Sequence, residues 1–277
     1  MARITEISWC DSTVNPVMGC DGCELWTPPD GGPRACYAGT LHERYGGKSK
    51  GYAERFLEPQ LFPGRMAEAA KWSDLTGTKR EDKPWLDGLP RHVFISDMGD
   101  ALSEGVPWVF LRREIVETVA AWPHVGMWLT KQPRAMWQFA HFLGHGLRLW
   151  PPNLWAGASV TDPRRQRARI DHLRVVPAAV RFLSVEPLLA DPGALDLNGI
   201  SLVIVGGESG PRARPCDLAW IRSVVEQCRA ASVPVFVKQD SGPRPGMQGR
   251  IQDDLWVREF PDARTLPGAA GAGSSRP

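Results

Sequence analysis

Long apolar runs are absent from this sequence. Its 277 residues contain no stretch near the roughly 18 consecutive apolar residues that a membrane-spanning helix needs. The opening residues, MARITEISWCDST, also lack the apolar core of a secretory signal. From these two absences we expect no membrane association and a cytoplasmic location.

The sequence also lacks an excess of charge of either sign. Lys and Arg number 33 against 31 Asp and Glu, and only 7 of the 33 are lysines. The remaining 26 arginines suit phosphate binding. Nucleic-acid affinity follows net charge and field, so we favour a GC-rich coding sequence as the explanation of the arginines. No Walker loop and no helix-opening G-x-G-x-x-G motif occurs, so nucleotide-phosphate chemistry has little support.

What is present is typical of a folded protein with a sizeable core. Hydrophobic residues make up 43% and charged residues 23%, which excludes a disordered chain, a coiled coil and a collagen-like fibre. The length suits one (β/α) barrel of about 250 residues or two smaller domains. Because no low-complexity linker divides the chain, we predict one barrel domain over residues 1–261. The small, polar residues 262–277 predict a disordered tail.

Short apolar runs alternate with segments of helical period. We predict seven strands, most of them buried on both faces as in a parallel sheet, at Ile4–Trp9, His92–Ser96, Gly126–Thr130, Asn153–Ser159, Val180–Val185, Leu202–Val205 and Val233–Lys238. Apolar spacings of three and four predict helices at Trp108–Trp122, Pro163–Val175 and Leu218–Ala231. This alternation predicts an α/β fold, a single partial or complete (β/α) TIM-like barrel.

Polar residues gather where the predicted strands end. Parallel β/α folds bind ligands at the carboxyl ends of their strands. Any one polar residue there is explained by solvent alone, but the set together favours a ligand site. Gly206 and Gly207 allow a close approach of a ligand to the backbone, and the carboxylate of Glu208 can accept from an ammonium. The candidate ligand-binding residues are Asp97, Asp100, Lys131, Ser159, Glu186, Gly206, Gly207, Glu208 and Lys238.

Four of the six cysteines lie within the first 36 residues, in a predicted loop spanning residues 10–37. In a cytosolic chain such clustering favours metal binding over disulfides. Cys20 and Cys23 form a C-x₂-C pair, and Cys36 follows. Three cysteines can ligate three irons of a [4Fe–4S] cluster and leave the fourth open. Cys10 or His42 as a fourth ligand would instead complete a closed zinc site, and the spacing alone leaves both open. The place of the loop, beside the predicted ligand-binding face, favours the open cluster.

Several ordered motifs carry a resemblance to a known family. The segments NPVMGC, ACYA, FISDMGD, LTKQP, NLWAGASVTD, VRFLSVEPLL, LVIVGGESGPRARP and PVFVKQ resemble the phage- and actinobacteria-associated three-Cys-motif proteins, which are similar to radical S-adenosylmethionine (SAM) enzymes. The resemblance covers about Ile7 to Gln239. It implies a radical-SAM-like barrel in which Cys20, Cys23 and Cys36 ligate a [4Fe–4S] cluster and SAM chelates the open iron. The cysteine spacing here, C-x₂-C-x₁₂-C, differs from the usual C-x₃-C-x₂-C.

The resemblance also implies a reaction. We expect reductive cleavage of SAM to start radical chemistry, with electrons from an external donor and the strand-end residues holding SAM. The phage link suggests a nucleic-acid or nucleotide substrate for modification or repair. Arginines in residues 163–169 near exposed-looking tryptophans fit that substrate, but the near-zero net charge favours a solvated helix face beside core tryptophans. The alternative function is a non-catalytic zinc or iron–sulfur protein that serves as partner to another enzyme.

Overall fold

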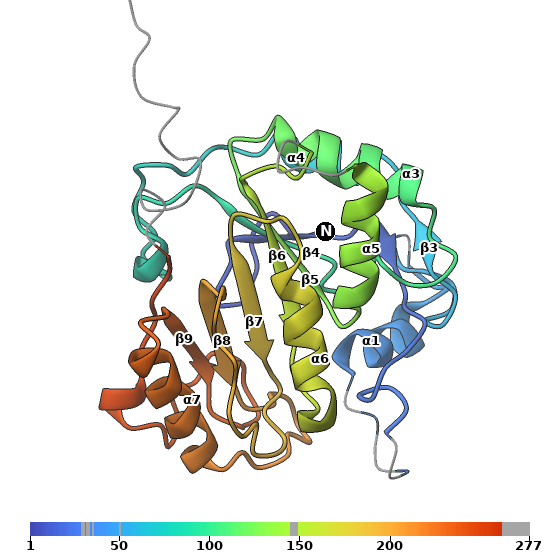
Figure 1. The fold of residues 1–277 in the computed structure, drawn as a ribbon. Coiled ribbons are helices and arrows are strands. Elements are labelled where there is room, and N and C mark those ends of the chain that lie inside the picture. The colour runs from blue at the N-terminus through green and yellow to red at the C-terminus, as the bar shows by residue number, and fades with distance from the viewer. Residues whose placement is uncertain (29–30, 32–33, 35, 50, 145–148, 262–277) are drawn as a thin grey trace, which may run out of the picture.

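A computed structural model describes residues 1–28, 31, 34, 36–49, 51–144 and 149–261. Seven parallel strands form one sheet in sequence order, and the sheet curls into a half-barrel flanked by helices (Figure 1). β1 and β9 are the two edges of this sheet and do not pair, so the barrel is partial. The strands are β1 (Ser12–Val14), β4 (His92–Ile95), β5 (Val125–Thr130), β6 (Leu154–Ser159), β7 (Arg181–Val185), β8 (Leu202–Gly206) and β9 (Val235–Gln239). Six of the predicted strands are confirmed to within two residues at each end.

The three predicted helices are confirmed. α6 (Pro163–Arg174) and α7 (Leu218–Ala230) begin after aspartates whose side chains cap the first turn. The helix predicted at 108–122 is α3 (Trp108–Leu111), a π-helical stretch η2 (Arg112–Glu117) and α4 (Thr118–Ala120). The remaining elements are α1 (Tyr37–Tyr45), α2 (Arg65–Ala70), α5 (Pro133–Leu143), the short helices η1 (Pro84–Leu86) and η3 (Asp253–Leu255), and an antiparallel pair, β2 (Val17–Met18) and β3 (Gln60–Leu61). None of the helices in the described ranges has the length and apolar character that crossing a bilayer requires.

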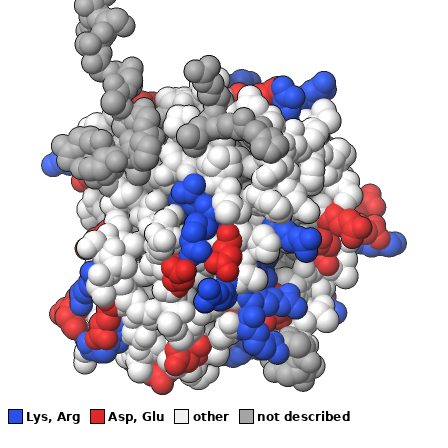
Figure 2. Space-filling model, in the orientation of Figure 1, with Lys and Arg blue, Asp and Glu red and all other residues white. Residues whose placement is uncertain are grey.

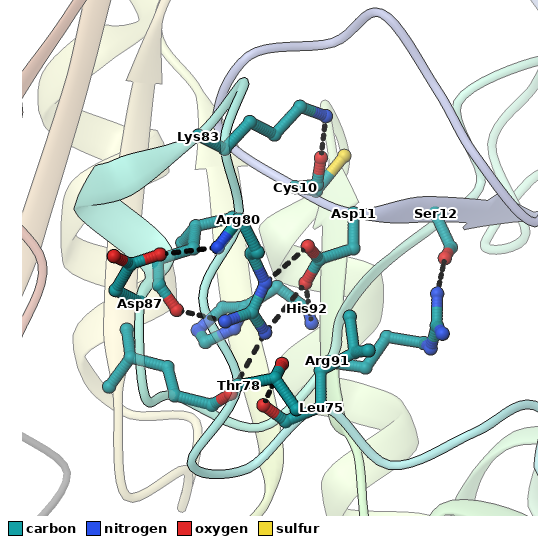
Figure 3. Close-up of polar contacts among 12 residues, drawn as sticks. Cys10, Asp11, Ser12, Leu75, Thr78, Arg80, Lys83, Asp87, Arg91 and His92 are labelled. Carbon is teal, nitrogen blue, oxygen red and sulfur yellow. Dashed lines mark hydrogen bonds and ion pairs between the residues drawn. The ribbon is translucent and has the colours of Figure 1, made fainter.

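The prediction of a first strand at Ile4–Trp9 is wrong. β1 lies further along, at Ser12–Val14, and pairs in parallel with β4. The carbonyl groups of the preceding segment are taken by side chains instead of a neighbouring strand: Lys83 Nζ donates to those of Thr5, Ile7 and Cys10 (2.7, 2.8 and 2.5 Å), as Figure 3 shows for Cys10. The apolar run there is buried by tertiary packing, a use that local pattern does not distinguish from a strand.

The curled sheet has an apolar core on each face, because successive side chains of a strand point to opposite sides. The outer core fills the space between the sheet and its helices. The inner core fills the hollow of the half-barrel, and Trp9 plugs it, with its ring 4.6 Å from that of Phe94 and 6.4 Å from that of Phe182. The segment mistaken for a strand therefore forms the floor above which a cavity opens.

Candidate functional site

A cavity of about 540 Å³ opens at the carboxyl ends of the strands; we call it the rim cavity. Its apolar walls include Leu25, Phe94 and Leu129. It brings together all three cysteines of the predicted cluster and eight of the nine predicted strand-end residues, Gly206 being the exception. They are Cys20, Cys23, Cys36, Asp97, Asp100, Lys131, Ser159, Glu186, Gly207, Glu208 and Lys238.

Backbone amides orient two of the three thiols. Gly22 N donates to the sulfur of Cys20, and Gly39 N donates to that of Cys36, each at 3.4 Å. Cys36 is also the N-cap of α1, so the helix start fixes its position. Burial raises the pKa of both thiols, and for Cys20 the nearby Asp100 raises it further. Because metals bind thiolates, metal binding here would release the thiol protons.

The two residues considered as a fourth ligand, Cys10 and His42, lie apart from the three thiols. Cys10 is fully buried in the inner core, and His42 packs against Tyr52 and Phe56 with its Nδ1 2.8 Å from the carbonyl oxygen of Ala38. Neither residue lines the rim cavity. Within the described ranges, no three or more His, Cys, Asp or Glu side chains are gathered closely enough to hold a metal ion. The thiols therefore share a cavity without forming a ready-made ion site.

Two carboxylates hold the C-x₂-C loop in place, and sequence reasoning missed both. The first is Asp21, which accepts from Ser103 Oγ (3.2 Å), the backbone N–H of Glu104 (3.0 Å) and Gln132 Nε2 (3.0 Å). These partners follow β4 and β5. One side of the loop is thus tied to the rim of the half-barrel. The available signal was an acidic residue directly after each cysteine of the pair.

The second carboxylate is Glu24, tied to β6 and α6. It accepts two bonds from the Arg169 guanidinium (2.7 and 3.0 Å) and one from Thr161 Oγ1 (2.6 Å). The Glu24 and Arg169 side chains are only 7% and 8% exposed. Hydrogen bonds and charge from Arg169 outweigh the opposing effect of burial and lower the pKa of Glu24 to about 2. The ion pair is therefore buried and charged.

Several predicted strand-end carboxylates are already engaged by the protein. Asp100 accepts from Thr130 Oγ1 (2.8 Å) and from the backbone N–H groups of Lys131 and Leu102 (3.0 Å each), while burial raises its pKa. Glu208 is paired with the guanidinium and backbone N–H of Arg214, at 2.8–3.1 Å. Their interactions hold loops in place, and the role predicted for them as ligand contacts stays a prediction.

The rim cavity is lined by lysines as well as by carboxylates. Lys238 Nζ lies 2.7 Å from Glu186 Oε2. Among the described residues, none accepts a hydrogen bond from Lys131 Nζ, and the electrostatic effect of this lysine lowers the pKa of Cys36. Lys131 is therefore free to bind an anion beside the thiols.

Tyr37, directly after Cys36, is a cavity residue that the predicted site did not include. Its hydroxyl donates to the carbonyl oxygen of Asp97, and 55% of the residue is exposed. Asp97 itself accepts from Asn15 Nδ2 (2.5 Å), and burial raises its pKa. Tyr37 thus places an accessible aromatic ring in the cavity beside the Cys36 thiol.

The arginines of residues 163–169 do not form an unopposed basic surface. Arg164 and Arg165 lie 3.0 and 3.7 Å from Asp162, Arg167 lies 3.7 Å from Asp171, and Arg169 is the buried partner of Glu24. Figure 2 likewise shows acidic and basic groups interspersed on the visible face. These ion pairs agree with the solvated helix face that the sequence favoured.

Comparisons with known proteins add one finding. A family model described as "Protein of unknown function (DUF5131)" matches residues 4–261. Searches of curated proteins and of solved structures returned no match.

Proposed function

This chain belongs to the DUF5131 family, and we propose that it is a radical-SAM-like enzyme: an iron–sulfur protein that binds SAM in the rim cavity and cleaves it reductively. One observation carries the proposal. The three clustered cysteines and the polar strand ends, far apart in the sequence, line the same cavity. Its volume of about 540 Å³ falls within the range of about 300–1,000 Å³ for small-molecule sites.

In this proposal Cys20, Cys23 and Cys36 would hold a [4Fe–4S] cluster, leaving one iron for SAM. When bound, such a cluster would supply the electron for reductive cleavage of SAM. The protein's own residues would bind SAM and shield it from water. Lys131, whose Nζ makes no ion pair with any described residue, would bind the SAM carboxylate beside the thiols. Phe94 and Leu129 line the cavity with apolar surface that excludes water.

The nucleic-acid or nucleotide substrate stays a prediction that rests on the sequence resemblance. The ion-paired arginines of residues 163–169 add no support for it. The proposed cleavage of SAM does not depend on which substrate follows it.

The test is anaerobic reconstitution with iron and sulfide, followed by metal analysis and chromatography for 5′-deoxyadenosine under a strong reductant. We expect about four irons per chain and 5′-deoxyadenosine formation. Replacing Cys20, Cys23 or Cys36 by Ala should abolish both. The matched control is Cys228→Ala, because this cysteine is buried in the outer core and should leave iron content unchanged.

One bound zinc and no iron would instead support the non-catalytic alternative. Cleavage of SAM that survives all three cavity substitutions would disprove the mechanism.

A further inference from the structure

The buried Glu24–Arg169 pair joins the cysteine loop to the sheet. Glu24 directly follows Cys23, and its carboxylate meets the Arg169 guanidinium with two hydrogen bonds. Arg169 Nη1 also donates to the carbonyl oxygen of Ser159, the last residue of β6 (3.1 Å). One guanidinium therefore touches both the cysteine loop and a strand end that lines the rim cavity.

The geometry of the Glu24–Arg169 contact suits precise placement of the cysteine loop. A guanidinium presents its donors in a rigid plane, so a bidentate contact fixes direction as well as distance. The pair lies away from solvent, where salt screens it little. Thr161 Oγ1, on the loop after β6, donates to the same carboxylate and leaves the Glu24 head group little freedom to turn.

We propose that Glu24 and Arg169 are positioning residues that fix the C-x₂-C loop over the rim cavity before any cofactor binds. The proposal rests on the proposed function in one respect: this loop carries two of the three proposed cluster ligands. Asp21 holds the opposite side of the loop, so loss of the Glu24–Arg169 pair should free Cys23 most and Cys20 less.

The test measures how fast each thiol of the metal-free, reduced, full-length protein reacts with N-ethylmaleimide, by peptide mass mapping. Glu24→Gln removes the pair but leaves Arg169 as a buried charge without a counterion. The double variant Glu24→Gln/Arg169→Met removes both charges together, so that neither is left buried without a counterion. In both variants we expect Cys23 to react at least fivefold faster than in the wild type, with Cys228 unchanged.

The matched control is Asp240→Asn. Asp240 is also a buried carboxylate (4% exposed) that contacts an arginine, Arg250, through both oxygens. Arg250 in turn donates to the carbonyl oxygen of Cys216, so this variant should raise the reactivity of Cys216 and leave that of Cys23 unchanged. We therefore expect Glu24→Gln to raise the reactivity of Cys23 and not that of Cys216, and Asp240→Asn to raise that of Cys216 and not that of Cys23.

Two results would overturn the proposal: wild-type reactivity of Cys23 in the double variant, or an equal increase at all six cysteines, which marks general destabilisation. A second readout is iron loss to a chelator after reconstitution, expected to be about fivefold faster in the double variant. If the wild type binds no iron, the proposed function fails, while the thiol rates still decide whether the pair positions the loop.

Discussion

Two glycines, Gly19 and Gly99, pack closely where the cysteine loop meets the sheet. Gly19 has a φ of +89°, a conformation that favours glycine, and its carbonyl oxygen would lie 2.2 Å from a Cβ built on Gly99. The two residues form a backbone bridge, with Gly19 N donating to the carbonyl oxygen of Met98 (3.4 Å). The position of Cys20 thus depends on the absence of a side chain at residue 99.

We expect Gly99→Ala to lower the free energy of unfolding by about 1–3 kcal/mol, because the added methyl group meets backbone rather than a flexible side chain. Urea denaturation measures the change. Gly242→Ala is the control: a Cβ there meets no atom within 4 Å, so its effect should stay within about 0.5 kcal/mol. Equal effects of the two substitutions would contradict the role of the close contact.

His92 makes stability depend on pH. Burial lowers the pKa of its side chain from 6.5 to about 4 in the folded protein. The unfolded chain therefore binds the proton first as pH falls, so stability is full above pH 6.5 and is lost between about 6.5 and 4. At 1.36 kcal/mol per pH unit, the complete loss is about 3 kcal/mol.

The variant His92→Leu should flatten this dependence when free energies of unfolding are compared at pH 7 and pH 4.5. Pro90 loses the contact of its carbonyl oxygen with His92 but keeps the hydrogen bond from Arg80 Nη2 (3.1 Å). An unchanged slope in the variant would assign the acid sensitivity to other groups.

At the scale of elements, a polar clamp holds the N-terminal segment against the half-barrel. Figure 3 shows Arg80 reaching Asp11 and Lys83 reaching the carbonyl group of Cys10. The Asp11 carboxylate also accepts from the backbone N–H of His92 in β4 (2.8 Å). The clamp replaces the hydrogen bonds that a strand would have made and keeps Trp9 inside the hollow of the sheet.

Removing one partner of this clamp should be costly. Arg80→Ala leaves the Asp11 carboxylate, 7% exposed, buried without its counterion, and we expect a loss of about 3–5 kcal/mol in the free energy of unfolding. The comparison is Arg112→Ala: Arg112 and Glu117 are both more than half exposed, so its loss should be below about 1 kcal/mol. Similar losses of stability in the two variants would contradict the expectation that the buried Arg80–Asp11 pair matters more than the exposed Arg112–Glu117 pair.

At the scale of the whole molecule, terminal segments cover both edges of the open sheet. Ala2 exchanges two backbone hydrogen bonds with Thr13 of β1 (2.9 and 2.8 Å). At the other edge, the carbonyl oxygen of Val257 accepts from Val237 N of β9 (2.7 Å), and Glu259 N donates to the carbonyl oxygen of Val235 (3.0 Å). Uncovered sheet edges invite pairing with other chains, so these segments protect an incomplete barrel.

Truncation after Leu255 should therefore promote self-association, because it exposes the β9 edge. Sedimentation velocity over a concentration series should show larger species than for the full-length chain. Truncation after Pro261 keeps the covering segment and should match the full-length protein. If both truncations sediment alike, the edge is protected by something else.

Local pattern was sufficient for much of this protein. Buried strands, capped helices and the polar residues at strand ends are set by residues close together in sequence, which is why six strands and three helices are confirmed. The parallel arrangement then requires those strand ends to share one rim. The meeting of Asp97, Lys131, Glu186 and Lys238 in a single cavity followed from that requirement.

Tertiary structure decided the features that depend on competition between distant partners. The apolar run at residues 4–9 fills the hollow of the half-barrel because Lys83 and its neighbours satisfy its backbone. Asp100 and Glu208 are engaged by other protein groups, while Lys131 makes no ion pair with any of the described residues. No local spacing encodes which of these side chains finds a partner in the fold. Hydrophobic periodicity indicates which side chains are buried. Which distant residues cover those side chains, and which polar groups pair, is determined only in the folded chain.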